Sequence, residues 1–380
     1  MKILHTSDWH LGRQFYGQSL EEAHKACLDQ VLQAIKTHHP NVLIVAGDIF
    51  DRAAPPASAV RLYNDFMARV YSETETAIIV IAGNHDSGDR VAANSAMVDQ
   101  NRVLIRGPVA NDEPPFMVQD DYGPVAFSAL PFAGEFAARD CFENTEITSP
   151  ADVMAAQMQV ARQHIEPGTR WVVIAHAYVS TALTSESERP LLIGGVETVP
   201  PESFTGVDYV ALGHLHRPQG LEGGRLRYSG APLAFGFDEG EGQKSMALVE
   251  LDGKGIASTQ LLPFLPLQKV RKVRGAFADI LEQGRQSPSD DFLKIELTDR
   301  DALIDPMGQL RQVFPCAMVL EYVRDQEVKE HDVHTHASRS LDAPEDVVSD
   351  FLTYVRDEPP SDDDKAFIQA TFNRLTQQGD

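Results

Sequence analysis

The first half of the chain alternates short apolar runs with longer stretches whose apolar residues repeat at helical spacing. The runs at 41–46 (NVLIVA) and 77–82 (AIIVIA) are continuous and rich in β-branched residues, as expected for strands that are covered on both faces. The stretches at 20–38 and 58–71 have the period of helices that pack along one side. This alternation predicts an α/β fold with a layered core.

The alternation continues to about residue 262 and then changes. Further apolar runs lie at 125–130, 171–175 and 207–212, with a helical stretch at 150–165 and a β-rich stretch at 225–262. Two prolines, Pro263 and Pro266, interrupt the chain where this first domain, 1–262, is expected to end. The shorter pattern at 263–325 predicts a small α+β domain, and the polar residues 326–340 predict a linker.

Two amphipathic helices are predicted within 341–380. Their apolar residues are Val347, Val348, Phe351, Leu352 and Val355 in the first helix, and Phe367, Ile368, Phe372 and Leu375 in the second. Pro359 and Pro360 separate the helices, and Ser361 with Asp364 resembles a capping box at the second start. Such helices must bury their apolar sides, so the pair is expected to pack on its own domain or to dock on a partner.

Five short apolar runs are each followed by Asp, Asn or His, often with a glycine that lets the backbone turn sharply. The residues are Asp8, His10, Asp48, Asn84, His176, His214 and His216. The carboxyl ends of strands in an α/β sheet meet at the edge where ligands bind. We therefore expect these seven side chains to converge, although they are spread over the first 216 residues.

These side chains form a mixed oxygen and nitrogen donor set without thiolate, which suits manganese, iron or zinc better than calcium. Seven donors are too many for one ion and fit two, and Asp48 is the expected bridge because its segment lies between the other two early motifs. Two such ions would clamp the attacking and leaving oxygens of an in-line displacement and lower the pKa of a water. The sequence therefore predicts hydrolysis of phosphate esters.

Two neighbours of Asn84 complete the predicted site. His85 is expected to protonate the leaving oxygen or to contact the phosphate. Asp86 is expected to orient a histidine from behind the metal ligands. Other motifs are weaker: the histidines within 331–336 lie in a polar linker, EGEGQ (239–243) is interpreted as a turn, and SGAPLAFGF (229–237) is either a loop near the site or a β-connection.

The bulk properties exclude some classes of protein. The net charge of −23 argues against a simple nucleic-acid-binding domain, which normally carries a basic face. Cys27, Cys141 and Cys316 lack CxxC spacing, so reduced cysteines in a cytoplasmic protein are expected. No apolar run is long enough for a membrane span, and the N-terminus does not have the pattern of a signal peptide.

The motifs DxH, GDxxD, GNHD and GHLH, with the isolated His176, resemble those of the calcineurin-like metallophosphoesterases over residues 1–262. The resemblance implies a two-sheet α/β sandwich with a dimetal site. The seven residues given above match the ligand positions of that family one by one, and His85 matches its acid or phosphate-contacting histidine.

A closer resemblance is carried by HTSDWHLG, GDIFDRAAPP, GNHDS and ALGHLHRPQ, which are similar to motifs of the nucleases that process DNA double-strand breaks. It implies two Mn²⁺ ions, with Mg²⁺, Fe²⁺ or Zn²⁺ as alternatives. It further implies exonuclease activity on double-stranded ends and endonuclease activity on hairpins and single strands, in DNA repair, recombination and replication. Residues 263–325 would then be a DNA-contacting capping domain.

The same resemblance implies partners and a location. The helix pair at 341–380 would dock on the coiled-coil base of an SMC-like ATPase. Two nuclease subunits would form a homodimer within a heterotetramer, in the cytoplasm and associated with the nucleoid. One position departs from the family: archaeal relatives carry His at the place of Asp51, and a carboxylate there repels phosphate unless a metal ion or Arg52 offsets it. We therefore assign no catalytic role to Asp51.

Two other functions stay open. GDIFDR is similar to the GDxVDR motif of phosphoprotein phosphatases, although those enzymes have GNHE where this chain has GNHD. A phosphatase acting on phosphoproteins or nucleotides is therefore the first alternative. A non-catalytic DNA-end scaffold with structural metal ions is the second, and the complete set of competent ligands argues against it.

Overall fold

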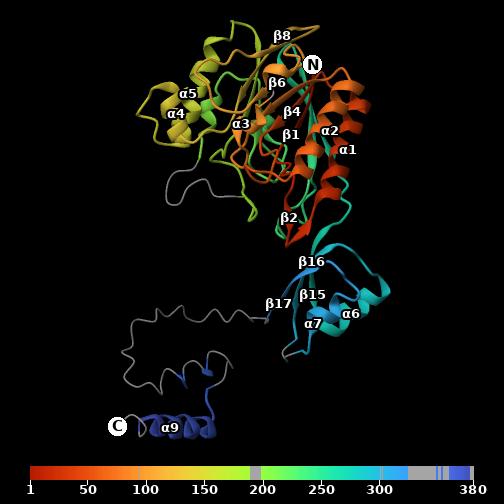
Figure 1. Ribbon diagram of the computed structural model, residues 1–380, viewed down its shortest axis with the longest axis vertical. Coiled ribbons are helices and arrows are strands. Elements are labelled where there is room, and N and C mark those ends of the chain that lie inside the picture. The colour runs from red at the N-terminus through yellow and green to blue at the C-terminus, as the bar shows by residue number, and fades with distance from the viewer. Residues whose placement is uncertain are drawn as a thin grey trace. The chain divides into compact units, whose positions relative to one another are not determined.

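The computed structural model describes residues 1–93, 95–188, 198–299, 301, 303–323, 348–349, 352–353 and 359–376. Two compact units divide the chain, Met1–Arg324 and Asp325–Asp380. The larger unit holds two six-stranded sheets, a three-stranded sheet and a two-stranded ribbon (Figure 1). No helix among the described residues is long and apolar enough to cross a lipid bilayer.

The first sheet has the strand order β14-β13-β1-β4-β5-β6. Its strands are β1 (Lys2–Thr6), β4 (Val42–Ala46), β5 (Ala77–Ile81), β6 (Val103–Arg106), β13 (Ser245–Asp252) and β14 (Gly255–Pro263). Strands β1, β4, β5 and β6 run parallel, whereas β13 and β14 are antiparallel to their neighbours. Every residue of β4 and β5 is buried, as their continuous apolar runs predict.

The second sheet has the order β11-β12-β10-β9-β8-β7. Its strands are β7 (Phe116–Asp120), β8 (Gly123–Leu130), β9 (Arg170–His176), β10 (Tyr209–Gly213), β11 (Gln219–Leu221) and β12 (Leu226–Tyr228). The four central strands run parallel, and the two outer strands are antiparallel to them.

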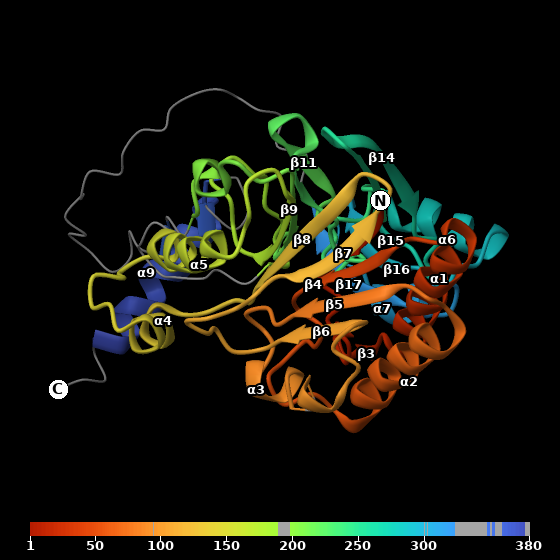
Figure 2. The same cartoon turned by 90° about the horizontal axis from the view of Figure 1, so that it is seen from above.

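The two sheets pack face to face, with β4 lying against β9 and β10. The apolar core between them includes Ile44, Ile79, Phe127, Ile174 and Tyr209. Helices α1 (Glu21–His38) and α2 (Ala57–Glu73) cover the outer face of the first sheet, and α5 (Pro150–Gln163) covers the outer face of the second (Figure 2). The predicted α/β class, with a two-sheet sandwich, is confirmed.

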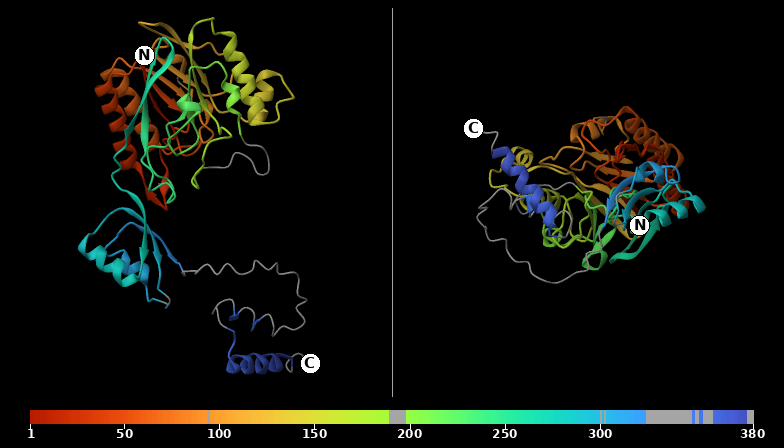
Figure 3. Two further views of the ribbon diagram at one scale, coloured as in Figure 1. Left: turned by 180° about the vertical axis from the view of Figure 1, so that it is seen from behind. Right: turned by 90° about the horizontal axis from the view of Figure 1, so that it is seen from below.

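The small sheet has the parallel order β15-β16-β17, and α6 (Phe277–Gln286) and α7 (Pro306–Leu310) pack on one of its faces (Figure 3). Its strands are β15 (Val270–Gly275), β16 (Phe292–Leu297) and β17 (Ala317–Tyr322). The opposite face contributes Val270 and Phe292 to the core of the first sheet. There the Phe292 ring lies 5.0 Å from the ring of Phe15.

Among the described residues, the remaining elements are short, apart from α9 in the second unit. They are β2 (Gln14–Phe15), β3 (Gln18–Ser19), α3 (Gly88–Val91), η1 (Ser95–Met97), α4 (Glu135–Phe142), η2 (Pro201–Phe204), η3 (Glu222–Gly224) and α9 (Asp362–Thr376). At the start of α9, Ser361 Oγ accepts the Asp364 N–H at 3.2 Å, and Asp364 Oδ2 accepts the Ser361 N–H at 3.0 Å. The predicted capping box is therefore confirmed.

Several sequence predictions fall on the rest of the C-terminal region. The predicted linker at 326–340, including the histidines within 331–336, lies outside the described residues. So does most of the first predicted tail helix, of which 348–349 and 352–353 are described and helical.

Candidate metal centre

The structure brings all seven predicted ligands to one edge of the sandwich. Asp8 and His10 follow β1, Asp48 follows β4 and Asn84 follows β5, all in the first sheet. In the second sheet, His176 is the last residue of β9, and His214 and His216 follow β10. The strand-end pattern predicts one sheet edge for these segments, whereas the structure draws them from two facing sheets.

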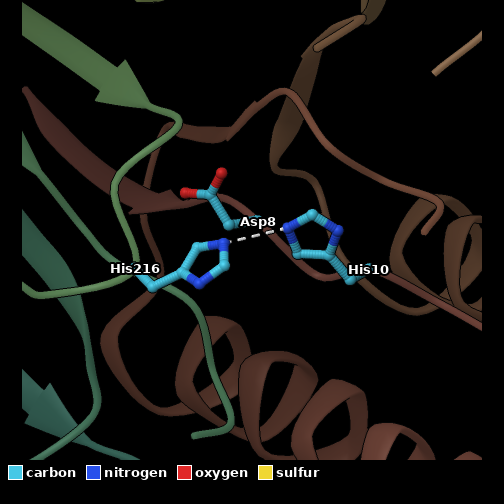
Figure 4. A group of neighbouring side chains, drawn as sticks. All are labelled: Asp8, His10 and His216. Atoms are coloured by element: carbon cyan, nitrogen blue, oxygen red, sulfur yellow. Dashed lines mark hydrogen bonds between the residues drawn. The ribbon is translucent and has the colours of Figure 1, made fainter. Parts of the chain in front are cut away.

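One half of the site joins Asp8, His10 and His216. All three are buried, and their donor atoms lie within 4.8 Å of one another. Figure 4 shows the rings of His10 and His216 facing each other, with Asp8 beside them. The Nε2 atoms of the two rings are 3.1 Å apart. Since nitrogen ligands lie about 2.0–2.1 Å from an ion such as zinc, two nitrogens at this spacing can share one ion.

The other half of the site joins Asn84, His176 and His214. Asn84 Oδ1 lies 2.9 Å from His176 Nε2 and 3.2 Å from His214 Nδ1. The Nδ1–H of His176 donates to the Ala46 carbonyl at 2.9 Å, so the neutral ring that a metal ion requires has its lone pair on Nε2. Two acceptor atoms, Nε2 and the amide oxygen, then face each other, and a shared cation would satisfy both.

Asp48 lies between the two halves. Its Oδ2 is 3.4 Å from Nε2 of His176 and 3.6 Å from Nε2 of His10. Its Oδ1 accepts the backbone N–H of His85 at 2.8 Å. From this position, Asp48 could supply an oxygen ligand to an ion held by either set of donors.

Without a cation, the electrostatics of the centre favour neutral imidazoles at His10 and His214, whereas at His176 burial is outweighed by the charge of Asp48, which raises the pKa of that ring to about 9. Burial lowers the pKa of His214 to about 3, and burial also holds the pKa of His10 well below its ordinary value. Neutral rings offer the lone pairs that a metal ion needs. Burial raises the pKa of Asp8 to about 6, which shows the cost of placing a carboxylate there without a cation. The donor set therefore fits divalent metal ions.

The backbone at the ligands is strained. Asp8, His10 and Asp48 have φ values of 53°, 47° and 51°, in the left-handed region that side chains other than glycine rarely adopt. The glycines beside the ligands allow close packing: a Cβ on Gly213 would lie 1.8 Å from the Ala46 oxygen, and one on Gly83 would lie 2.3 Å from Asp48 Oδ1. The GN and GH motifs therefore need glycine for space.

His85 lies beside the predicted ligands and is oriented by the backbone. Its Nδ1–H donates to the carbonyl of Asp51 at 2.9 Å, and its ring centre is 4.7 Å from that of His10. The carboxylate of Asp51 has arginine on two sides, with Arg13 at 3.6 Å and Arg52 at 3.7 Å. The repulsion expected between Asp51 and a phosphate is thus offset by two cations rather than by Arg52 alone.

The prediction that Asp86 orients a histidine is wrong. Its Oδ2 accepts the backbone N–H groups of Gly83 and Ile49, and its Oδ1 accepts the N–H of Phe50, at 2.9–3.0 Å. Asp86 therefore ties the loop after β4 to the loop after β5. The N–H groups that it accepts lie close to Asp48 and Asn84 in the chain and need an acceptor inside the protein. Asp86 therefore supports these two predicted ligands through their backbone.

Sequence reasoning missed a second set of residues around His216. Phe235, in the segment 229–237, packs its ring 5.3 Å from His10 and 5.4 Å from His216, so that segment does lie at the site. Glu239, in the segment interpreted as a turn, is buried beneath Ser187. No periodicity marks these residues, and only the two glutamates beside Lys244 in a glycine-rich turn offered a signal.

Comparisons with known proteins agree with this geometry. Residues 1–218 match the profile of the calcineurin-like phosphoesterases. Residues 266–356 match a profile described as the Type 5 capsule protein repressor C-terminal domain. The D subunit of the nuclease SbcCD from Staphylococcus epidermidis (strain ATCC 12228 / FDA PCI 1200) is 30% identical over 324 residues, covering 85% of this chain and 86% of that protein.

Among solved structures, GAP50, the anchor in the inner membrane complex of Plasmodium, is similar with a TM-score of 0.42 and 12% identity. The match covers 86% of this chain and 98% of the other. A likeness at this level supports no conclusion about function.

Proposed function

This chain belongs to the calcineurin-like phosphoesterase family, as a relative of the SbcCD nucleases, and from this premise we propose that it is a metal-dependent nuclease that hydrolyses phosphodiester bonds in DNA. One observation carries the proposal: four imidazoles, two carboxylates and an amide oxygen meet at one edge of two facing sheets. The relative that matches over 85% of the chain is a nuclease, which favours DNA over other phosphate esters.

In this proposal the seven side chains hold two divalent ions. Asp8, His10 and His216 would hold one ion, and Asn84, His176 and His214 would hold the other, with Asp48 within reach of both sets. We propose manganese as the ion, as the family resemblance implies, with Mg²⁺, Fe²⁺ or Zn²⁺ as alternatives; the oxygen donors suit manganese and magnesium, and the imidazoles suit iron and zinc. Such a pair of ions stabilises charge on the phosphate oxygens and supplies a nucleophilic water.

His85 is the proposed proton donor. Its Nδ1–H is held by the Asp51 carbonyl, so the protonated ring can give up the Nε2 proton to the leaving oxygen of the cleaved strand. Arg13 and Arg52 both pair with the carboxylate of Asp51, the residue whose carbonyl holds His85. They add the positive charge that a DNA phosphate needs beside a carboxylate.

The small domain is the proposed DNA contact outside the metal centre. On β15 and β16, Lys272 and Lys294 are register partners, and Arg274 follows on the same face, opposite the helices. Two glutamates share this region: Glu296 is the register partner of Arg274, and Glu321 pairs with Lys294 at 2.8 Å. Basic side chains there would neutralise phosphates of a duplex, in a chain whose net charge is otherwise strongly negative. We propose double-stranded ends and hairpins as substrates.

The proposed assembly follows from the name of the relative, which is one component of a two-component complex. The C-terminal region, 341–380, would dock on a coiled-coil ATPase of the SbcC type. Two copies of this chain would form a homodimer within a heterotetramer, acting at the nucleoid in the cytoplasm.

The proposal is tested by comparing two substrates with the same purified protein and Mn²⁺. Release of nucleotides from linear duplex DNA is expected, with no turnover of a phosphopeptide. Turnover of the phosphopeptide with inert DNA would instead identify a phosphatase. His85→Ala is expected to lower DNA hydrolysis about 100-fold or more with little change in DNA binding; unchanged hydrolysis with weaker DNA binding would contradict the role of His85 as proton donor.

A further inference from the structure

A relay of hydrogen bonds runs from the buried Glu239 through the half-buried Ser187 to the ring of the buried His216. Ser187 Oγ lies 2.6 Å from His216 Nδ1 and also hydrogen-bonds to Glu239 Oε1. Glu239 is 2% exposed and forms an ion pair with Lys244, which is 7% exposed. These residues lie outside the predicted ligand set, yet they contact one of its members directly.

The chemistry of these three groups fixes the direction of each hydrogen bond. The ionised Glu239 can only accept, so the single hydroxyl proton of Ser187 is donated to it. Ser187 Oγ must then accept from His216, which places the ring proton on Nδ1. The lone pair of the neutral ring is left on Nε2, the atom that faces His10 and Asp8.

Further contacts hold the same residue from its backbone. The His216 N–H donates to Glu188 Oε1 at 2.7 Å, and Lys244 Nζ donates to the His216 carbonyl at 2.8 Å. Lys244 therefore neutralises Glu239 and restrains His216 at once. The contrast with His176 is informative, because the backbone carbonyl of Ala46 fixes that ring and no substitution can remove it.

We propose that Glu239 and Ser187 are positioning residues that set the tautomer of His216 and thereby tune metal affinity in one half of the centre. This inference rests on the proposed metal-dependent function and deepens it. Groups that fix the tautomer of a ligating histidine typically change metal affinity by about 10–100-fold.

The relay makes a specific prediction for Glu239→Gln. Lys244 can only donate, so it would attract the amide oxygen, and the amide NH₂ would then face Ser187. Ser187 would accept from the amide and donate its own proton to His216 Nδ1. The ring proton would move to Nε2, and the relay would work against metal binding.

The test measures Mn²⁺ binding by calorimetry in four variants of the full chain, without DNA. Ser187→Ala is expected to weaken one of two Mn²⁺ sites about 10–100-fold, and Ser187→Thr, which keeps a hydroxyl, is expected to restore it. Glu239→Gln is expected to weaken the site more than Ser187→Ala does. In the double variant the inverted relay is absent, so its affinity is expected to equal that of Ser187→Ala alone.

The matched control is Ser180→Ala, which changes an exposed serine on the same segment after β9. This variant is expected to bind Mn²⁺ like the wild type. The proposal would be overturned if the losses of Mn²⁺ affinity added in the double variant. It would also be overturned if Ser187→Ala bound Mn²⁺ as well as Ser180→Ala does. Nitrogen NMR of the labelled, metal-free protein gives an independent readout, in which the His216 ring is expected to carry its proton on Nδ1 and to lose that preference in Ser187→Ala. Absence of Mn²⁺ binding in the wild type would count against the proposed function, while the tautomer would still decide this inference.

Discussion

At the scale of single residues, the candidate centre is assembled by its backbone before any ion binds. The Asp8 N–H donates to the Gly47 carbonyl, and the His10 N–H donates to the Asp48 carbonyl, both at 3.0 Å. These bonds link the loops after β1 and β4 while Asp8, His10 and Asp48 hold left-handed φ values. Each such residue costs about 1 kcal/mol or more, so the strain is offset by the surrounding packing and the ligand positions are preorganised.

Asp86 is the residue whose loss tests this preorganisation. An asparagine would keep one acceptor oxygen but turn an NH₂ group toward a backbone N–H of Gly83, Ile49 or Phe50. Burial and then the charge of Asp48 raise the pKa of Asp86 to about 7. The wild type and the variant are therefore compared at about pH 8, where Asp86 is ionised. We expect Asp86→Asn to lower the free energy of unfolding by about 1–3 kcal/mol.

Urea unfolding of the metal-free protein measures this change, and calorimetric titration is expected to show weaker Mn²⁺ binding. The exposed Asp89→Asn, three residues further on, is the control and should leave both quantities unchanged. An Asp86→Asn protein as stable as this control would show that the two loops are held by other contacts.

Glu113 provides a test of burial far from the predicted ligands in sequence. Burial raises the pKa of this carboxyl from 4.5 to about 7, despite Arg106 at 4.0 Å. The folded chain therefore holds the proton more tightly than the unfolded chain, and this stabilisation is complete below about pH 4.5 and lost as the pH rises through about 7. Glu113→Gln cannot lose a proton, so its stability relative to wild type is expected to increase by about 1–3 kcal/mol between about pH 5 and pH 8.

Denaturant unfolding at the two pH values measures the difference. Glu146→Gln, at an exposed position, is the control and should show a constant offset from wild type. If the difference in unfolding free energy between Glu113→Gln and wild type were also the same at both pH values, the Glu113 carboxyl would be solvated in the folded protein.

At the scale of elements, the strands with long apolar runs could be predicted from the sequence. A strand that forms only because it pairs with a neighbour could not. The runs at 41–46 and 77–82 became β4 and β5 because their residues are apolar enough to be buried on both faces. Strand β7 was not predicted, because its sequence FMVQD mixes apolar and polar residues and its pairing with β8 supplies the structure.

The same limit applies to the site. Motifs at strand ends revealed the seven predicted ligands, since the topology of an α/β fold brings those ends together. Glu239 lies in a turn, and its contact with Ser187 depends on two loops that meet only in the folded chain. The role of Asp86 was misjudged for a related reason: hydrogen bonds to the backbone of another loop leave no trace in sequence spacing.

Strand β15 carries the prediction for this scale. Removing two positive charges with Lys272→Ala and Arg274→Ala is expected to weaken the binding of duplex DNA about equally for all sequences. The slope of the logarithm of affinity against the logarithm of salt concentration is expected to decrease by the contribution of roughly two phosphate contacts. Fluorescence anisotropy over a series of salt concentrations measures both effects. The control is Arg285→Ala on α6, on the helical face of the small sheet. An equal loss of affinity per charge removed in the control would mean that net charge, and not this face, governs DNA binding.

At the scale of the whole molecule, the net charge of −23 sets a condition on any nuclease function. Non-specific DNA affinity comes mainly from neutralising phosphates, and this chain carries 56 acidic against 33 basic residues. The positive charge must therefore be local, as near Arg13 and Lys272, or be contributed by a partner. A protein of this kind would bind DNA weakly alone and much better in a complex with a basic partner.

The proposed partner-docking region, 341–380, belongs to another unit than the metal centre. Residues 341–380 carry ten acidic and three basic residues and belong to the second unit, whereas all seven predicted ligands belong to the first. Deleting 341–380 is therefore expected to abolish co-purification with an SbcC-type ATPase while Mn²⁺-dependent hydrolysis of short DNA by the isolated chain stays within about twofold. Because the proposed docking region is strongly acidic, the intact complex should also dissociate more readily as salt is raised. Pull-down and nuclease assays on the same two proteins measure these effects, and a truncated chain that still retains the ATPase would place the interface in the first unit instead.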